Sequence, residues 1–194
     1  MAVSAKNTFS DEVIFKAVDA FAPYMIEAIK NIVRINSVQG EPTPEAPFGI
    51  GVKHALKQAL FDASELGFTT KNVDDYMGYA SFGSSEEYIC AVGHLDVVPA
   101  GFGWTHEPFG AEVAGGIIYG RGVLDNKGPI YACLYALAAL KKLGFEPETQ
   151  IRIIFGCNEE TGFGDLEYYM RSHPLWALRL TASIRWYMPS VVGL

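Results

Sequence analysis

Hydrophobic residues recur at helical spacing in several stretches of the chain. Ser10 can cap the first of these stretches, because its hydroxyl can accept a hydrogen bond from the backbone of the first turn. Pro23 is expected to divide that stretch into two helices. Gly67 and Gly144 follow two further stretches and are typical helix ends. The expected helices cover residues 11–33, 49–66, 129–143 and 165–171.

Shorter apolar runs favour β-strands, and they alternate with the helices along the chain. The run over residues 150–157 is almost continuously apolar, which is typical of a buried strand. The alternation predicts an α/β fold, with a mostly parallel twisted sheet and helices on both faces. Ligands bind such sheets at the carboxyl ends of their strands. The expected strands cover residues 68–73, 76–82, 87–92, 117–121 and 150–157, and the proline-rich segment 40–47 is expected to be a loop.

The pattern lapses near the C-terminus. Residues 168–194 contain no Asp or Glu and show neither a helical nor a strand period. We therefore expect a domain over residues 1–170 and an atypical tail over 171–194. A premature or frame-shifted end of a longer protein is the favoured interpretation of this tail, and a genuine apolar arm is the alternative.

The length, charge and cysteine content of the chain exclude several classes of protein. With 194 residues and 49% hydrophobic residues, the chain can form one domain with a real core. The net charge is −7, and the largest basic cluster is the pair Lys141-Lys142, which argues against nucleic acid and against an anionic membrane surface. No secretory signal and no run long enough to span a bilayer is present, so a cytoplasmic location is expected. The three cysteines lack CxxC spacing, which favours buried, reduced thiols (Cys90, Cys133 and Cys157).

Five residues with metal-binding or acid–base side chains fall at or just beyond predicted strand ends. They lie in the segments GHLDVVP, GRGVLDNKGP and GCNEETG (His94, Asp96, Asp125, Glu159 and Glu160). One imidazole and several carboxylates form a ligand set suited to zinc or a similar divalent metal. His94 and Asp96 point to the same side of an extended segment, so Asp96 can orient the imidazole.

Each of these signals is weak by itself. A histidine two residues from an aspartate can be a satisfied pair beside a turn, and Asp125 can cap the helix that follows it. Alternatively, Asp125 can bridge two metal ions about 3.5–4 Å apart. The side chains of Glu159 and Glu160 diverge, so one can bind a metal while the other faces substrate. No phosphate-binding loop and no G-x-S-x-G elbow occurs, which argues against kinases, dehydrogenases and serine hydrolases.

The three segments taken together are far more specific for one family than any single residue in them. The three segments resemble the signatures of the co-catalytic di-zinc peptidase family, which contains aminoacylases, succinyl-diaminopimelate desuccinylases and dipeptidases. The pattern W-x-x-x-P-F-x-A-x-V-x-x-G-x-I-Y-G-R-G over residues 104–122 also resembles this family. The motifs NKG and CNEETG are most similar to those of the PepV-type branch, which includes Xaa-His dipeptidases. The resemblance covers most of residues 1–170 and implies a zinc-peptidase-like catalytic domain.

The resemblance also implies a role for each residue. His94 would bind one zinc ion and Asp96 would orient His94. Asp125 would bridge two zinc ions (Zn2+, with Co2+ or Mn2+ as possible substitutes), and Glu160 would bind the second ion. Glu159 would be the general base that deprotonates the bridging water. The implied substrates are small dipeptides, hydrolysed at their amide bond.

The chain also departs from the family pattern. The family has a further acidic ligand after the glutamate pair, a last histidine ligand near the end of a longer chain, and a second lid or dimerisation domain. Because the sequence shows none of these, we expect a truncated chain that is weakly active or inactive. The alternatives are a deacylase of N-acyl amino acids (acetylornithine or succinyl-diaminopimelate type) and a non-catalytic remnant or binding module. The oligomeric state stays open.

The other histidines are weaker candidates for site residues. His54 is expected on a helix surface or in packing, and His106 is expected near the rim, where it could touch substrate. His173 is a weak candidate for a substitute ligand.

Overall fold

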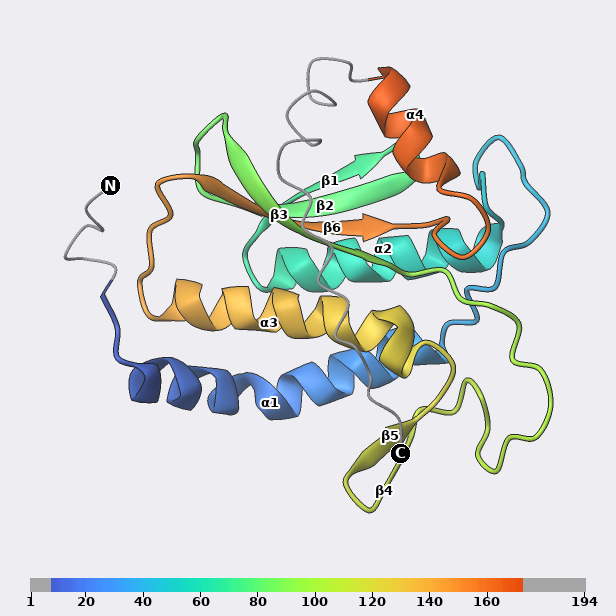
Figure 1. Cartoon of the computed structure of the whole chain (residues 1–194), viewed down its shortest axis with the longest axis horizontal. Coiled ribbons are helices and arrows are strands. Elements are labelled where there is room, and N and C mark those ends of the chain that lie inside the picture. Colours follow the sequence, from blue (N-terminus) through green and yellow to red (C-terminus); the bar gives the residue numbers. More distant parts are fainter. Residues whose placement is uncertain (1–7, 173–194) are drawn as a thin grey trace.

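A four-stranded sheet with helices on both faces forms the centre of the protein (Figure 1). The computed structural model describes residues 8–172. The helices are α1 (Asp11–Arg34), α2 (Ile50–Glu65), α3 (Gly128–Lys142) and α4 (Gly164–Ser172), with a short helical turn η2 (Val123–Lys127) before α3. The strands are β1 (Thr69–Val73), β2 (Met77–Phe82), β3 (Tyr88–His94), β4 (Glu112–Ala114), β5 (Ile117–Tyr119) and β6 (Gln150–Gly156).

The sheet has the order β1-β2-β6-β3, and β4 and β5 form a separate hairpin. The α/β class is confirmed, as are helices on both faces, but the strand directions correct the expectation of a mostly parallel sheet. Only β3 and β6 run parallel, whereas β2 is antiparallel to both β1 and β6. The reason is local: Val73 and Met77 face each other across a short turn, and so short a connection can only join antiparallel strands.

Two apolar layers hold the helices against the sheet. Helices α2 and α3 cover one face, with α1 packed against them on the side away from the sheet, and α4 lies on the other face (Figure 1). The larger layer is fully buried at its centre, where Ile32, Leu56, Leu134 and Phe155 each have 0% of their surface exposed. Burying a side chain of this size contributes about 1.5–3 kcal/mol. This packing fixes the carboxyl ends of β3 and β6, which carry the candidate site.

Helix α1 runs unbroken through Pro23, so the two helices expected there are one. Ser10 caps it as predicted, because its Oγ accepts the N–H of Val13 at 3.4 Å. Pro23 and Asp19, four residues earlier, are both exposed. Water can therefore hydrate the carbonyl that loses its helical hydrogen bond at the proline, and the helix is not interrupted.

Two smaller expectations need correction. Strand β4 was not predicted, because its three residues include only one large apolar side chain, that of Val113. Of the three free cysteines only Cys157 is buried, while Cys90 is half-buried and Cys133 is exposed. Cys133 and its neighbour Ala132 are both exposed on α3. His173 and residues 173–194 of the proposed tail lie outside the described residues.

None of the helices between residues 8 and 172 combines the length and the apolar character that a membrane crossing requires.

Candidate metal centre

The parallel pair β3–β6 brings two of the three predicted segments together. His94, the last residue of β3, stands opposite Gly156, the last residue of β6. The N–H of Leu95 also donates to the carbonyl of Gly156 at 2.9 Å, which extends the pairing by one step. Because the strands are parallel, the segments that follow them leave the sheet at the same edge. His94 and the turn over residues 157–160 are therefore neighbours.

The third segment, the turn η2, packs directly on β3. The side chain of Asn126 accepts the backbone N–H of His94 at 3.3 Å. A Cβ atom at Gly93 would lie only 2.3 Å from that Asn126 oxygen, so glycine at position 93 permits the close approach. The peptide bond between Asp125 and Asn126 is cis. The packing places Oδ1 of Asp125 at 3.0 Å from Nε2 of His94.

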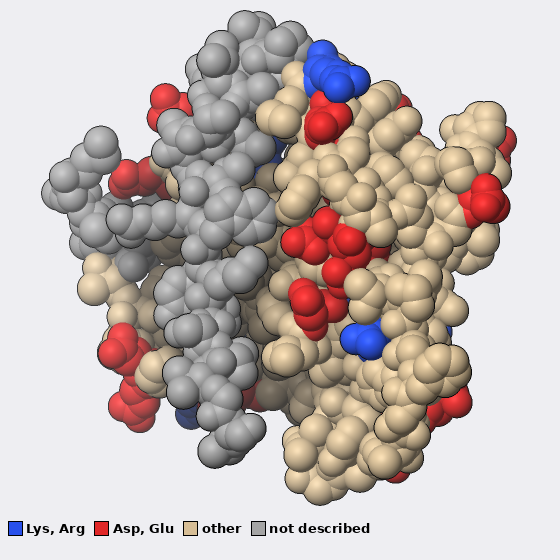
Figure 2. Space-filling model, turned by 45° about the vertical axis from the view of Figure 1, so that its right-hand side comes forward, with Lys and Arg blue, Asp and Glu red and all other residues tan. Residues whose placement is uncertain are grey.

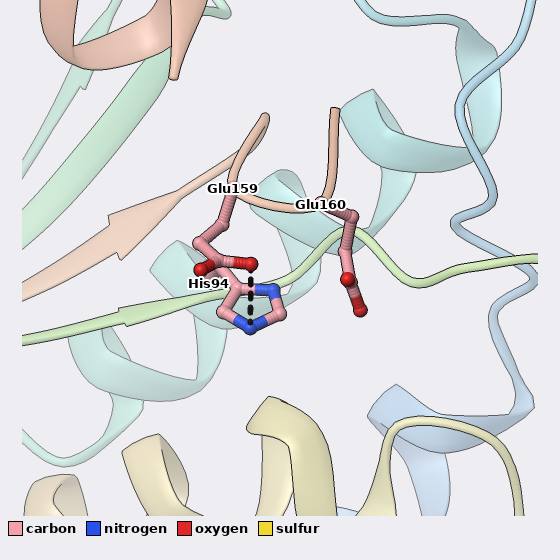
Figure 3. A group of neighbouring side chains, drawn as sticks. All are labelled: His94, Glu159 and Glu160. Carbon is pink, nitrogen blue, oxygen red and sulfur yellow. Dashed lines mark ion pairs between the residues drawn. The ribbon is translucent and has the colours of Figure 1, made fainter. Parts of the chain in front are cut away.

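The predicted ligands thus converge on one point. Ligand atoms of His94, Glu159 and Glu160 all lie within 4.8 Å of one another. Figure 3 shows the imidazole from β3 beside the two carboxylates from the turn after β6, with Oε2 of Glu159 at 3.7 Å from Nε2 of His94. The side chain of Asp125 is 72% exposed and that of Glu159 is 32% exposed, so both remain accessible to a solute. In the described part of the chain, His94, Glu159 and Glu160 form a group that could hold a metal ion.

The imidazole of His94 is almost enclosed, with 6% of the residue exposed. Its Nδ1 lies 3.0 Å from the backbone carbonyl of Asp96 and 3.4 Å from the Asp96 carboxylate. Burial alone would lower the pKa of His94, but hydrogen bonds and charge from Asp96, with a further hydrogen bond from Asp125, raise this pKa to about 9. The imidazole is therefore held in a strongly cation-favouring environment.

The Asp96 carboxylate has a second set of partners. Its Oδ1 accepts the N–H of Glu159 at 3.2 Å, and its Oδ2 accepts the N–H of Glu160 at 3.0 Å. Asp96 is only 1% exposed, and hydrogen bonds of this kind are required by a buried carboxylate. Asp96 therefore holds the backbone of the glutamate pair as well as the imidazole. The sequence predicted its contact with His94 but not its contact with the turn.

The site concentrates negative charge. Burial is the largest of the effects that raise the pKa of Glu160. His94 opposes this effect, and the neighbouring carboxylates of Asp125, Glu159 and Asp96 add to it. Acidic side chains also gather near the middle of the face shown in Figure 2. Oxygen and imidazole donors with excess negative charge fit a divalent cation, which would relieve the repulsion among them.

Lys127 is a residue of the site region that sequence reasoning missed. It follows Asp125 by two positions and is 0% exposed. Its ammonium group donates to the carbonyls of Ile32 at 3.0 Å and Ile35 at 2.8 Å, at the end of α1. Burial lowers the pKa of Lys127 to about 7, and the charge of Asp96 partly opposes this effect. The signal in the sequence was a lysine just before an apolar helix, which is not distinctive.

The other described histidines lie outside the cluster. Nδ1 of His106 is 3.0 Å from Glu112 Oε2, and its ring stacks on Tyr119 with centroids 3.8 Å apart. His106 thus belongs to the β4–β5 hairpin region, and its contact with substrate stays a prediction. His54 is exposed on α2, as expected.

A shallow cavity of about 460 Å³ adjoins the cluster. One wall is formed by Val97, Val98 and Pro99, which follow Asp96 in the chain. Another part of the lining is Thr161, the residue after Glu160. Thr161 donates its hydroxyl hydrogen to Gln39, which joins Thr161 to the part of the lining formed by residues 38–42. The lining is largely apolar with a few polar groups, as in small-molecule sites (Val38, Gln39, Gly40, Glu41, Pro42, Val97, Val98, Pro99 and Thr161).

Comparisons with known proteins give a family and several relatives. Residues 90–183 match the model of peptidase family M20/M25/M40. A putative dipeptidase, YtjP, of Bacillus subtilis strain 168 is 40% identical over 149 residues, which are 76% of this chain and 32% of that protein. The Beta-Ala-Xaa dipeptidase of Lactobacillus delbrueckii subsp. lactis is 37% identical over 153 residues, which are 77% of this chain and 33% of that protein. The chain therefore spans about a third of the length of these relatives.

Solved structures have the same fold. The structure of human carnosine dipeptidase 1 matches with a TM-score of 0.71 and 28% identity, over 83% of this chain and 37% of that one. An M20 family metallo-carboxypeptidase of Sulfolobus solfataricus matches with a TM-score of 0.64 over 78% of this chain and 35% of that one. Its 22% identity supports the likeness of fold alone.

Proposed function

Since the chain carries a domain of peptidase family M20/M25/M40, we propose that it is part of a metal-dependent hydrolase of dipeptides. The observation that carries this proposal is the convergence of His94, Glu159 and Glu160 within 4.8 Å, with Asp125 at 3.0 Å from the imidazole. The relatives named as dipeptidases support a dipeptide as substrate over an N-acyl amino acid.

The donor set suits two divalent ions, with zinc as the proposed metal. His94 and Asp125 would hold one ion, and Asp125 and Glu160 would hold the other. Bound at such a site, a pair of ions supplies a water of low pKa and a polarised amide carbonyl. Among residues 8–172, this assignment gives each ion two protein ligands, whereas catalytic zinc ordinarily has three. We therefore expect this chain alone to bind metal weakly and to turn over substrate slowly, if at all.

Glu159 is the proposed general base. Its backbone N–H is fixed by Asp96, and its carboxylate lies in the cluster while remaining partly exposed. From that position it can accept the proton of the attacking water and later deliver it to the leaving amine. Glu160 has its own backbone N–H held by the same aspartate, so the two carboxylates keep different directions (Figure 3).

The cavity beside the cluster offers a place for a substrate side chain. It begins one residue beyond both Asp96 and Glu160, so a peptide bond at the cluster would bring an adjacent side chain to it. Its apolar lining from Val97, Val98 and Pro99 favours an uncharged side chain.

A direct experiment combines metal binding with hydrolysis. Zinc affinity is measured by isothermal titration calorimetry on this 194-residue chain, and the release of amino acids is measured with alanyl-histidine and with N-acetyl amino acids. Specific zinc binding that is lost in Glu160→Gln, together with any cleavage restricted to dipeptides, supports the proposal. Absence of specific binding, or cleavage restricted to N-acyl substrates, contradicts it.

A further inference from the structure

Four consecutive backbone N–H groups at the end of β6 all donate to buried carboxylates. The N–H groups of Cys157 and Asn158 donate to Oδ2 of Asp165, at 2.6 and 3.1 Å. The next two N–H groups, those of the glutamate pair, donate to the two oxygens of Asp96. The turn that carries the proposed base and ligand is thus held by one carboxylate inside the site and by one outside it.

Asp165 is built into this contact. It is 1% exposed and lies in the first turn of α4, where its Oδ1 also accepts the N–H of Leu166 at 2.8 Å. Three backbone donors therefore surround one buried carboxylate, and charge-assisted hydrogen bonds of this kind are the stronger ones in proteins. A Cβ atom at Gly156 would lie 2.9 Å from Oδ2 of Asp165, so the strand carries glycine where the carboxylate approaches.

The same region is closed by a second set of bonds. The side chain of Asn158 accepts the N–H of Gly164 at 2.9 Å, and its backbone carbonyl accepts the N–H of Phe163 at 2.7 Å. The start of α4 and the turn therefore form one hydrogen-bonded unit, with Asp165 at its buried side.

The planarity of the peptide bond carries this restraint to the glutamates. Each peptide unit is rigid, so fixing the N–H directions on both sides of a Cα atom fixes the two backbone dihedral angles at that residue. Asp165 fixes the units before Cys157 and Asn158, and Asp96 fixes those before Glu159 and Glu160. With Asp165 removed, the first half of the turn can rotate, and the direction in which the chain enters Glu159 changes.

We propose that Asp165 is a positioning residue of the metal centre, which orients Glu159 and Glu160 through the backbone of the turn without touching metal or substrate. This proposal rests on the proposed function for the part that concerns metal. The hydrogen-bonded turn itself exists independently of that function, so the two can be tested separately.

The test compares Asp165→Asn and Asp165→Ala with a control, Asp62→Asn. Asp62 is also a partly buried carboxylate with two hydrogen-bond partners, but these are Gln58 and Tyr131, outside the turn. Zinc affinity is measured by calorimetry, and hydrogen exchange of the backbone amides is measured without metal. Asn keeps the volume and one acceptor oxygen, which provides a folded variant if the alanine variant does not fold.

We expect a loss of zinc affinity of about tenfold for Asp165→Asn and up to about 100-fold for Asp165→Ala, the range found when a group that orients a metal ligand is removed. Exchange over residues 157–160 becomes faster, while the amides of β2 and β3 and the control variant keep wild-type values. Such a pattern is not produced by general destabilisation, which would also accelerate exchange in the strands.

Three outcomes overturn the proposal: unchanged exchange over residues 157–160 in the folded variants, unchanged zinc affinity despite faster exchange, or an equal loss of affinity in Asp62→Asn. If the wild-type chain binds no zinc, the proposed function fails. Faster exchange confined to the turn would still support the structural role of Asp165 in that case.

Discussion

Nε2 of His94 lies 3.0 Å from Oδ1 of Asp125, although the two residues are 31 positions apart in the chain. This contact joins an imidazole with a raised pKa to a carboxylate that remains mostly exposed. A metal ion and a proton would compete for the same nitrogen atom, which gives the site a defined dependence on pH.

The zinc affinity of the chain is expected to rise with pH up to about 9. The pKa of His94 is about 9, so at lower pH the imidazole must lose a proton before it can bind metal. Below that pKa the affinity should increase about tenfold for each pH unit, because one proton is released for each ion bound there. Calorimetry at pH 6.5, 7.5 and 8.5 in two buffers of different ionisation enthalpy measures the zinc affinity and the number of protons released. A flat profile with no proton release contradicts the assignment of His94 as a ligand.

The two adjacent glutamates are expected to respond differently to the same substitution. Glu159→Gln should keep zinc affinity within a few-fold and reduce any hydrolysis by about 10²–10⁴-fold, the usual contribution of a general base. Glu160→Gln should lose zinc affinity, because the amide cannot replace the charged ligand. Each variant serves as the control of the other. Loss of zinc affinity in Glu159→Gln with retention in Glu160→Gln would reverse the two roles.

Asp96→Asn tests the aspartate that holds both the imidazole and the turn. An asparagine keeps only one acceptor oxygen for the two N–H groups that the carboxylate now accepts, and its NH₂ group faces the other donor. We expect a loss of about 1–3 kcal/mol in the free energy of unfolding. Zinc affinity should also fall, by about 10–100-fold. Urea unfolding and calorimetry measure the two effects, and Asp62→Asn is again the matched control.

Lys127→Met tests the buried ammonium group. The folded-state pKa of Lys127 is about 7, below its ordinary value of 10.5, so the unfolded chain binds more protons between these pH values. Its burial therefore costs stability fully below pH 7, and this cost disappears as pH rises towards 10.5. At high pH the methionine variant should be less stable, because the carbonyls of Ile32 and Ile35 lose their donor. The loss of stability in the methionine variant should be smaller at pH 6, or reversed. Urea unfolding at pH 6 and 9.5 measures this difference. A larger loss at pH 6 than at pH 9.5 contradicts the lowered pKa.

The helices and longer strands followed from the sequence because their patterns are periodic. Helix α2 covers Ile50–Glu65 where 49–66 was expected, and β6 covers Gln150–Gly156 where 150–157 was expected. The strand directions did not follow from the same patterns, because apolar periodicity carries no information on direction. Only the two-residue gap between the expected strands 68–73 and 76–82 indicated the antiparallel turn.

The convergence of His94, Asp125 and the glutamate pair was predictable, because segments that follow parallel strands share one edge of the sheet. The roles given to these residues remain predictions. The contacts made by Asp165 and Lys127 were not predictable, because they join side chains to backbone groups of distant elements. Asp165 stands at the start of the expected helix 165–171, and its contact with Cys157 and Asn158 appears only in the folded chain.

The pairing of β3 with β6 also determines when the centre can exist during folding. Asp96 and Glu159 are 63 residues apart, and the segment between them includes the β4–β5 hairpin and α3. Bringing the ends of so long a segment together costs more conformational entropy than forming a local contact. Non-local pairings of this kind therefore slow folding. An intermediate without the β3–β6 pair lacks both the parallel edge of the sheet and the assembled set of proposed metal ligands. The time at which a refolding chain first captures zinc would therefore report the step that completes its architecture.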